Sequence, residues 1–318
     1  MKTNTINPIY LGFALIKLAR PVHWVKNLGI FAALVFTGGL MDRQLFTTVF
    51  WAFCVFNLAS SATYVFNDIV DRERDRAHPI KRYRPIASGA VPVSLASFYA
   101  ITLAIISIIW SYNISEIFST LVLSYLLLQI AYSLYLKNLH IIDILIIASG
   151  FVIRIYSGAF LIDAHLSVWF LLCVISIALF LASGKRRAEL GVVGSSTKTR
   201  KSLKRYPVEL LNSYVTMFGN AAWMSWALFT FFESPKASLP VWLLLAELSK
   251  TTTVDKLLMI TIPVTIFGIM RYQSLIFEGR SEAPEKLLLR DIPLVTSVII
   301  WAFLVVSILY GGPSASHF

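Results

Sequence analysis

About nine stretches of roughly 20 apolar residues run along the chain, and lipid is the solvent that such stretches require. Each is apolar on nearly every face, whereas a membrane β-strand alternates apolar and polar residues. In lipid, a helix satisfies its own backbone hydrogen bonds. The sequence therefore predicts an all-α, polytopic membrane bundle of about nine transmembrane helices. We expect them near residues 24–41, 46–66, 92–112, 116–136, 141–162, 167–184, 213–232, 257–273 and 292–311.

Composition agrees with a membrane protein and indicates one domain. Of the 318 residues, 57% are hydrophobic and 14% are charged, whereas soluble domains carry about 25% charged residues. No linker or internal repeat divides the chain, so we expect a single domain over residues 1–318. Cys54 and Cys173 lie within expected spans and have no spacing typical of a disulfide framework or a metal site. The first 23 residues contain polar breaks, and no removable signal peptide is expected.

The net charge of +11 is distributed by membrane side. If the N-terminus is cytosolic, the outer segments carry only Arg43, Lys236, Lys250 and Lys256, and Arg154 lies within a span. The other 23 of the 28 Lys and Arg residues then fall on the inner side. Positive residues favour the cytosolic side, so we expect an N-in, C-out protein of a bacterial inner membrane. Topology explains the basic charge, and no nucleic-acid partner is expected.

An acidic cluster follows the second expected span. Asn67, Asp71 and Asp75 are spaced by four residues and fall on one face if the helix continues out of the bilayer, with Asp68 beside them. Mg²⁺ binds a few carboxylates together with water and substrate phosphate. Acids at a helix C-terminus oppose the helix dipole, so stability does not explain them. We expect a magnesium-diphosphate site facing the cytosol; the alternative is a solvated helix end whose acids pair with Arg72, Arg74 and Arg76.

Basic residues follow in two places. Lys81 and Arg82 come directly after the acidic cluster, and they could neutralise the oxygens of a diphosphate. Lys185 and Arg186 come directly after the sixth expected span and could hold a second phosphate. A basic cluster that merely fixes topology explains this second pair about equally well. The phosphate-loop pattern Gly-x-x-x-x-Gly-Lys-Ser/Thr is absent there.

Three residues near or within spans are further candidates. Arg154 lies inside the fifth expected span, where an ionisable residue suggests function; it could meet a lipid phosphate or the carbonyls of another helix. Asp143 lies about 16 Å away along that helix, too far for direct pairing. Tyr132 and Lys137, at the end of the fourth span, could place a hydroxyl and a cation at the depth of the acidic cluster.

These residues resemble a known family. The pattern Asn-Asp-x-x-Asp-x-x-x-Asp from Asn67, followed by Arg-Pro-Ile-Ala-Ser-Gly from Arg84, resembles the first signature of the UbiA superfamily of intramembrane prenyltransferases. The opening Arg-Pro-x-x-Trp-x-Lys-Asn from Arg20 is similar too. The resemblance covers essentially the whole chain, and it implies a UbiA-like bundle and a Mg²⁺-dependent transferase.

Within that superfamily, the chain resembles the decaprenyl-phosphate phosphoribosyltransferase branch. Three stretches carry this resemblance: residues 132–137, residues 184–190 and the pair Arg271-Tyr272 with the later residues 284–291. It implies transfer of 5-phosphoribose from phosphoribosyl diphosphate (PRPP) to a polyprenyl phosphate. Members that prenylate aromatic rings carry a second Asp-rich motif after the sixth span. Here Glu189 is the only acid of that segment before Glu209, so a donor with additional phosphates is expected.

The resemblance implies a role for each candidate residue. We expect the acidic cluster to hold Mg²⁺ and the donor diphosphate, Lys81 and Arg82 to neutralise the leaving group, and Lys185 and Arg186 to hold the 5-phosphate. Glu189 is a further expected substrate-binding residue. The lipid phosphate would lie near Lys137 or Arg154. Prenyl transfer to an aromatic acceptor is the first alternative. A membrane transporter is the second, although no inverted repeat with broken helices was found in the sequence. The sequence leaves the oligomeric state open.

Overall fold

The computed structural model describes residues 8–78, 80–193, 206–233, 235, 254–278 and 290–311. All regular structure within these ranges is helical, as expected. Seven of the helices are long and apolar enough to cross a membrane. These spans are Arg43–Val70 (α3), Val93–Ile114 (α5), Glu116–Leu134 (α6), Ile142–Leu161 (α7), Val168–Leu190 within α8 (Val168–Val193), Lys256–Phe277 (the end of η6, Val254–Thr261, with α11, Ile262–Phe277) and Ile292–Tyr310 (α13).

One further long helix, α9 (Val208–Phe232), covers the stretch expected at 213–232. The stretch expected at 24–41 is not one straight helix, and this expectation was wrong. It is broken into the 3₁₀-helix η1 (Pro21–Phe31), α2 (Ala32–Phe36) and the short η2 (Gly39–Met41). Gly38 separates the last two with φ of 82°, a left-handed conformation that ends an α-helix. A separate helix, α1 (Pro8–Ala19), precedes these segments.

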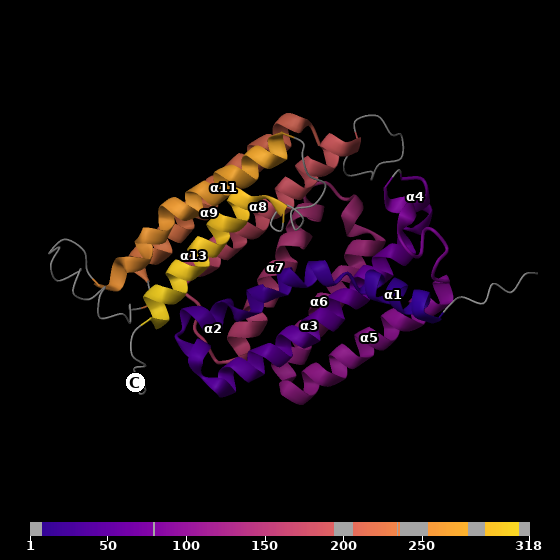
Figure 1. The fold of residues 1–318 in the computed structure, drawn as a ribbon, viewed down its shortest axis with the longest axis horizontal. Helices are drawn as coiled ribbons and strands as arrows, with labels where there is room; N and C mark the ends of the chain where they lie inside the picture. Colours follow the sequence, from indigo (N-terminus) through magenta and orange to yellow (C-terminus); the bar gives the residue numbers. More distant parts are fainter. Residues whose placement is uncertain are drawn as a thin grey trace, which may run out of the picture.

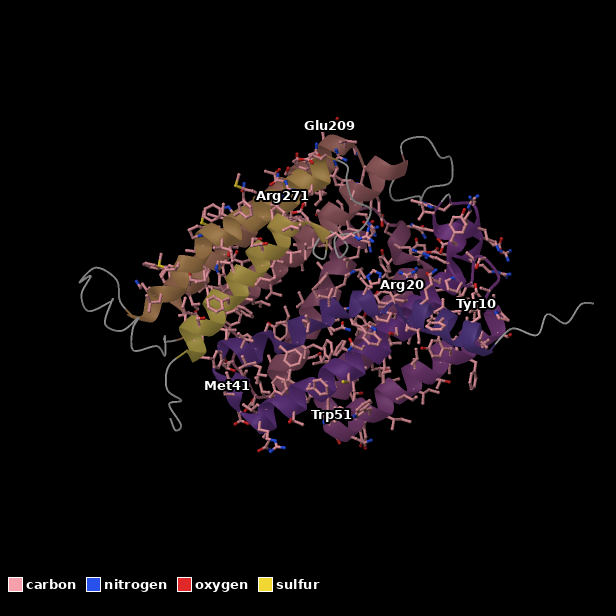
Figure 2. The ribbon with its side chains drawn as sticks, in the orientation of Figure 1. Tyr10, Arg20, Met41, Trp51, Glu209 and Arg271 are labelled. Atoms are coloured by element: carbon pink, nitrogen blue, oxygen red, sulfur yellow. The ribbon has the colours of Figure 1, made fainter. Side chains whose placement is uncertain are left out.

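The helices form two halves that meet at α7 (Figure 1). In one half α3 packs against α5 and α6, and its core centres on Phe56, Phe118 and Tyr125. In the other half α8 packs against α9, and α11 contacts both α9 and α13. Helix α7 contacts α6 on one side and α8 on the other. In Figure 2, Glu209 lies at the top of the molecule and Met41 at its lower left, at different ends of the helices.

Close packing of α7 on η1 fixes the broken segment in place. Gly158 of α7 lies so close to η1 that a Cβ atom there would be 1.9 Å from the carbonyl oxygen of Ile30. Only glycine fits at this distance, and small residues allow such approach between membrane helices.

Two further expectations concern helix ends. Lys185 and Arg186 lie inside α8, which continues to Val193, and not in a loop as expected. The residues involved, among them Lys, Arg, Ala and Glu, have high helix propensity, so the helix continues beyond its apolar part. The apolar residues 241–248 of the sequence could also form an interfacial helix, but they lie outside the described residues.

Candidate functional site

The acidic residues lie at the junction of α3 with the short helix α4 (Arg72–Arg76). Asp71 stands at the junction, and the helical hydrogen-bond pattern continues through it. Its N–H donates to the Asn67 carbonyl at 2.9 Å, and the Asp75 N–H donates to the Asp71 carbonyl at 2.8 Å. Asp68, Asp71 and Asp75 are buried, with 3%, 5% and 5% of their surface exposed. The end of α3 and the start of α4 therefore place three carboxylates in buried positions.

Two arginines from distant segments contact these carboxylates. Arg20, at the start of η1, places Nη2 2.5 Å from Asp68 Oδ1. Arg84 places a single nitrogen, Nη1, 2.9 Å from Asp68 Oδ1 and 2.7 Å from Asp75 Oδ2. Arg84 therefore bridges two acids that are seven positions apart along the chain.

A lysine occupies the other side of the cluster. Lys137, in the 3₁₀ turn η4 (Leu136–Asn138), is only 1% exposed. Its Nζ donates to Asp71 Oδ1 at 2.7 Å and to Asn67 Oδ1 at 3.5 Å. Arg74 lies further away, with Nη1 3.5 Å from Asp71 Oδ1. Thus Lys137 contacts both Asn67 and Asp71. Arg84 contacts both Asp68 and Asp75.

The carboxylates suit a divalent metal that also binds phosphate. Burial raises the pKa of Asp75 above its ordinary value, and the neighbouring Arg84 partly opposes this effect. In the part of the chain that the structure describes, no three His, Cys, Asp or Glu residues group closely enough to hold a metal ion alone. Mg²⁺ commonly binds through one or two carboxylates, with water and substrate phosphate completing its shell. Asp71 and Asp75, with Asn67, fit that kind of shared site.

A second ionic cluster surrounds Arg186, which is fully buried in α8. Its Nε lies 2.6 Å from Asp143 Oδ2, and its Nη1 lies 2.6 Å from Glu189 Oε2. Its Nη2 donates to the Tyr132 hydroxyl at 2.7 Å. Two carboxylates therefore neutralise this arginine before any substrate is present.

Tyr206 completes the second cluster just before α9. Its hydroxyl donates to Asp143 Oδ1 at 2.7 Å and accepts from the Ile141 N–H at 2.7 Å. Burial and the hydrogen bond to Asp143 raise the pKa of Tyr206 above its ordinary value. Ile141 has φ of 68°, a costly conformation for a β-branched residue. Such strain is most common at functional sites.

The connection between α6 and α7, together with the two helix ends that it joins, links the two clusters. It carries Tyr132 and Asp143 to Arg186, and between them Lys137 to Asp71. The expectation that Lys137 lies at the depth of the acidic cluster is confirmed by its contact with Asp71. Tyr132 instead belongs to the second cluster. One short connection thus places the acidic residues of α3 and the basic end of α8 on the same face of the bundle.

Arg154 lies apart from both clusters. It is buried, and Nε donates to Asn27 Oδ1 at 2.6 Å, Nη1 to the Gly150 carbonyl at 2.7 Å and Nη2 to the Tyr125 hydroxyl at 2.9 Å. Asn27 in turn donates to Asn57 of α3 at 2.6 Å. In this structure Arg154 therefore ties η1 to α6 and α7 through neutral groups.

The remaining predicted residues lie around the rim. Lys81 is half-buried in η3 (Lys81–Tyr83) and close enough to Asp75 to lower its pKa slightly. Arg82 is exposed and donates to the neighbouring Tyr83 hydroxyl at 2.6 Å. Lys185 is half-buried on α8, beside Arg186. The structure brings Lys81 near the acidic cluster and does not bring Arg82 into contact with it.

Four contact residues were not among the predicted site residues: Arg20, Arg84, Asp143 and Tyr206. Arg20 and Arg84 both precede a proline within the motifs that suggested the family, so a signal was present. Asp143 was noticed only for its distance from Arg154, and no local pattern points to Tyr206. Arg20 and Arg84 lie 48 and 16 residues from Asp68 along the chain. Asp143 lies 43 residues from Arg186, and Tyr206 lies 63 residues from Asp143.

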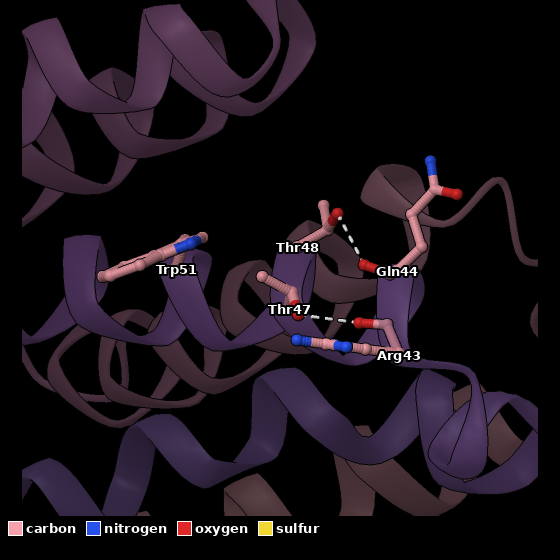
Figure 3. Close-up of a pocket in the computed structure, with 5 residues that line it drawn as sticks. All are labelled: Arg43, Gln44, Thr47, Thr48 and Trp51. Atoms are coloured by element: carbon pink, nitrogen blue, oxygen red, sulfur yellow. Dashed lines mark hydrogen bonds between the residues drawn. The ribbon is translucent and has the colours of Figure 1, made fainter.

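A shallow surface hollow lies far from these clusters, at the opposite end of α3 (Figure 3). It is lined by Arg43, Gln44, Thr47, Thr48 and Trp51. Thr47 and Thr48 donate their hydroxyl hydrogens to backbone carbonyls one turn earlier. Nothing in this lining resembles the acid and base chemistry of the other face.

The fold and site define an integral membrane protein with a buried acidic cluster that suits a metal-bound diphosphate. Comparisons with known proteins identify the family. The model of the UbiA prenyltransferase family matches residues 27–188. A decaprenyl-phosphate phosphoribosyltransferase of Corynebacterium glutamicum is 34% identical over 313 residues, covering 96% of this chain and 90% of that protein. Its counterpart in Mycolicibacterium smegmatis is 36% identical over 299 residues, covering 92% of each chain.

Solved structures agree on the fold. A UbiA homolog from Archaeoglobus fulgidus, bound to GPP and Mg²⁺, superposes with a TM-score of 0.66 at 17% identity, over 92% of this chain and 96% of that one. The chain belongs to the UbiA prenyltransferase family, and it is a membrane-embedded transferase of that family.

Proposed function

We propose that this enzyme transfers 5-phosphoribose from PRPP to a polyprenyl phosphate and releases diphosphate, with Mg²⁺ as cofactor. The two relatives described above support this proposal, because both are named decaprenyl-phosphate phosphoribosyltransferase and their similarity extends over nearly the full chain. We place the reaction at the cytosolic face of a bacterial inner membrane, because 23 of the 28 basic residues fall on that side of the expected topology.

One observation favours this donor over prenyl diphosphate. Glu189 is the only acid between Asp163 and Glu209, and its carboxylate forms an ion pair with the buried Arg186. A prenyl diphosphate held from the end of α8 through a metal ion would need carboxylates there that are not already neutralised. Lys185 instead offers a cation there, which suits the 5-phosphate of PRPP. We assign Arg186 to holding this helix end in place, and Lys185 to the phosphate.

The chemistry follows from these assignments. Asn67, Asp71 and Asp75 would hold the metal, which supplies positive charge to the diphosphate oxygens. A phosphate oxygen of the lipid attacks the anomeric carbon of the ribose, and the bond from that carbon to the diphosphate breaks. The attacking oxygen is already anionic, so no general base is required. Arg84 and Lys81 stabilise the negative charge that collects on the departing diphosphate.

The lipid phosphate must reach the anomeric carbon from the membrane side. Lys137 donates to Asp71 within the acidic cluster, on the connection that leads to the second cluster, so its positive charge can attract an incoming phosphate. Arg154 is fully engaged with neutral partners deeper in the bundle. We therefore assign the lipid phosphate to Lys137 and a structural role to Arg154.

The test uses purified enzyme in lipid nanodiscs with labelled PRPP, decaprenyl phosphate and Mg²⁺. A labelled lipid whose mass equals that of phosphoribosyl decaprenyl phosphate is expected. Asp71→Asn and Asp75→Asn should lower the rate by at least about a hundredfold, as expected when a ligand of a catalytic metal is lost. Glu73→Gln is the matched control, because Glu73 lies on the same helix with its side chain 77% exposed. Product from a prenyl diphosphate and an aromatic acceptor, without product from PRPP, would refute the proposal.

A further inference from the structure

The charges of the acidic cluster already balance without a metal. Three buried carboxylates, those of Asp68, Asp71 and Asp75, each lie within 2.9 Å of a cationic nitrogen. The cations are Arg20, Arg84 and Lys137. A divalent cation that entered alone would add two positive charges to poorly solvated carboxylates that are already neutralised, where repulsion is strong.

Arg84 occupies a carboxylate oxygen of Asp75, which is one of the residues proposed to hold the metal. Its Nη1 lies between Asp68 Oδ1 and Asp75 Oδ2, at 2.9 and 2.7 Å. Among the described residues, Arg84 is the one cation that forms an ion pair with Asp75. Asp68, in contrast, would keep Arg20 if Arg84 moved away.

The location of Arg84 allows such a movement. Its side chain is 27% exposed, compared with 1% for Lys137, and it lies just beyond the short η3 turn. A guanidinium group that leaves two carboxylates needs another anion, and the oxygens of a diphosphate accept its fork of donors well.

We propose that Arg84 is an internal counter-ion that blocks the metal site and is displaced only when metal and diphosphate arrive together. The metal would take the place of Arg84 at Asp75, and Arg84 would move to the diphosphate. Metal and diphosphate then bind with positive cooperativity, which by linkage is the same in both directions. This inference rests on the proposed diphosphate site and does not depend on which group the donor carries.

The test measures metal binding without catalysis. Mn²⁺ is titrated into the full chain in nanodiscs and followed by electron paramagnetic resonance, with and without inorganic diphosphate. In the wild type, diphosphate should tighten Mn²⁺ binding at least about fivefold, a typical coupling between two ligands. In Arg84→Gln, Mn²⁺ alone should bind about tenfold more tightly, and the effect of diphosphate should shrink.

Arg72→Gln is the matched control. Arg72 is the first residue of α4, next to Asp71, and its described ion pair is with the exposed Glu73 at 4.0 Å. If Arg72→Gln tightens Mn²⁺ binding as much as Arg84→Gln does, general electrostatics explains the effect and the proposal fails. It also fails if Arg84→Gln leaves Mn²⁺ binding unchanged or weakens it.

Two results remain decisive if Arg84→Gln does not fold. Equal Mn²⁺ affinity of the wild type with and without diphosphate refutes the proposal. Arg84→Lys, which keeps the charge but loses the fork, should retain weak binding of Mn²⁺ alone and bind diphosphate less tightly. None of these measurements requires phosphoribosyl transfer, so the proposed function can fail while the counter-ion role stands, and the reverse is equally possible.

Discussion

The ammonium nitrogen of Lys137 lies 2.7 Å from a carboxylate oxygen of Asp71, and both side chains are buried. These residues are 66 positions apart, at the ends of different helices. Their contact attaches the connection between α6 and α7 to the acidic cluster. The helix ends on either side of this connection place Tyr132 and Asp143 against Arg186. A change in the structure of one cluster can therefore shift the residues of the other.

Breaking the Lys137–Asp71 pair should destabilise the protein, because one buried charge loses its partner. For Lys137→Met we expect a loss of about 3–5 kcal/mol, the usual cost of removing one partner of a buried pair. The double variant Lys137→Met with Asp71→Asn should lose less free energy of unfolding than Lys137→Met alone. Denaturant unfolding in detergent measures both. Strict additivity of the two single changes would argue against the pairing.

The buried pair of Arg186 and Asp143 should be equally sensitive. Arg186→Met leaves two carboxylates, those of Asp143 and Glu189, without their cation, and we expect a loss of at least about 3 kcal/mol. Arg187→Gln is the control, because the neighbouring Arg187 is only partly buried and donates to Asn212 at 2.7 Å. The thermal midpoint should fall clearly for Arg186→Met and little for Arg187→Gln. Similar midpoints for the two variants would contradict the assignment of Arg186 to holding the helix end.

Gly158→Ala should separate η1 from α7. The added methyl group would meet the Ile30 carbonyl oxygen at 1.9 Å, so the backbones must move apart. Overpacking of this kind costs about 1–3 kcal/mol or more. Transfer activity should fall as well, since η1 carries Arg20 at its start. Gly12→Ala, at a helical position with open space around it, should change neither stability nor activity. Wild-type stability of Gly158→Ala would show that the close contact is absent.

Acid should weaken metal binding through Asp75. Burial raises the pKa of its carboxyl group, so the proton is held to a higher pH than in an exposed aspartate. A protonated carboxyl group cannot bind the metal. The Mg²⁺ concentration needed for half-maximal transfer should therefore rise as the pH falls through this raised pKa. Asp75→Asn has no proton to lose at this position. For its remaining activity, the Mg²⁺ concentration needed for half-maximal transfer should therefore depend less on pH. An identical pH dependence in both proteins would exclude Asp75 as the group responsible.

Hydrophobic patterning by itself determined the class of this protein. Runs of about 20 apolar residues allow little besides membrane helices, because only a helix or a closed barrel satisfies the backbone in lipid. The four-residue spacing of Asn67 and Asp71 placed both beside Lys137, because an α-helix repeats after about four residues. Asp75, one turn further on, instead shares Arg84 with Asp68. The break near Gly38 escaped prediction, since an apolar run looks the same whether or not its helix is continuous.

The partners of the charged residues were decided by the tertiary structure alone. No local pattern links Arg84 to Asp68 and Asp75, or Asp143 to Arg186 and Tyr206, because these contacts join segments that only packing brings together. Burial also changed the roles. Arg186 was expected to hold a phosphate, but it is enclosed by two carboxylates and a tyrosine. The sequence specified which charges the site contains, and the fold determined which of them neutralise one another and which can face a substrate.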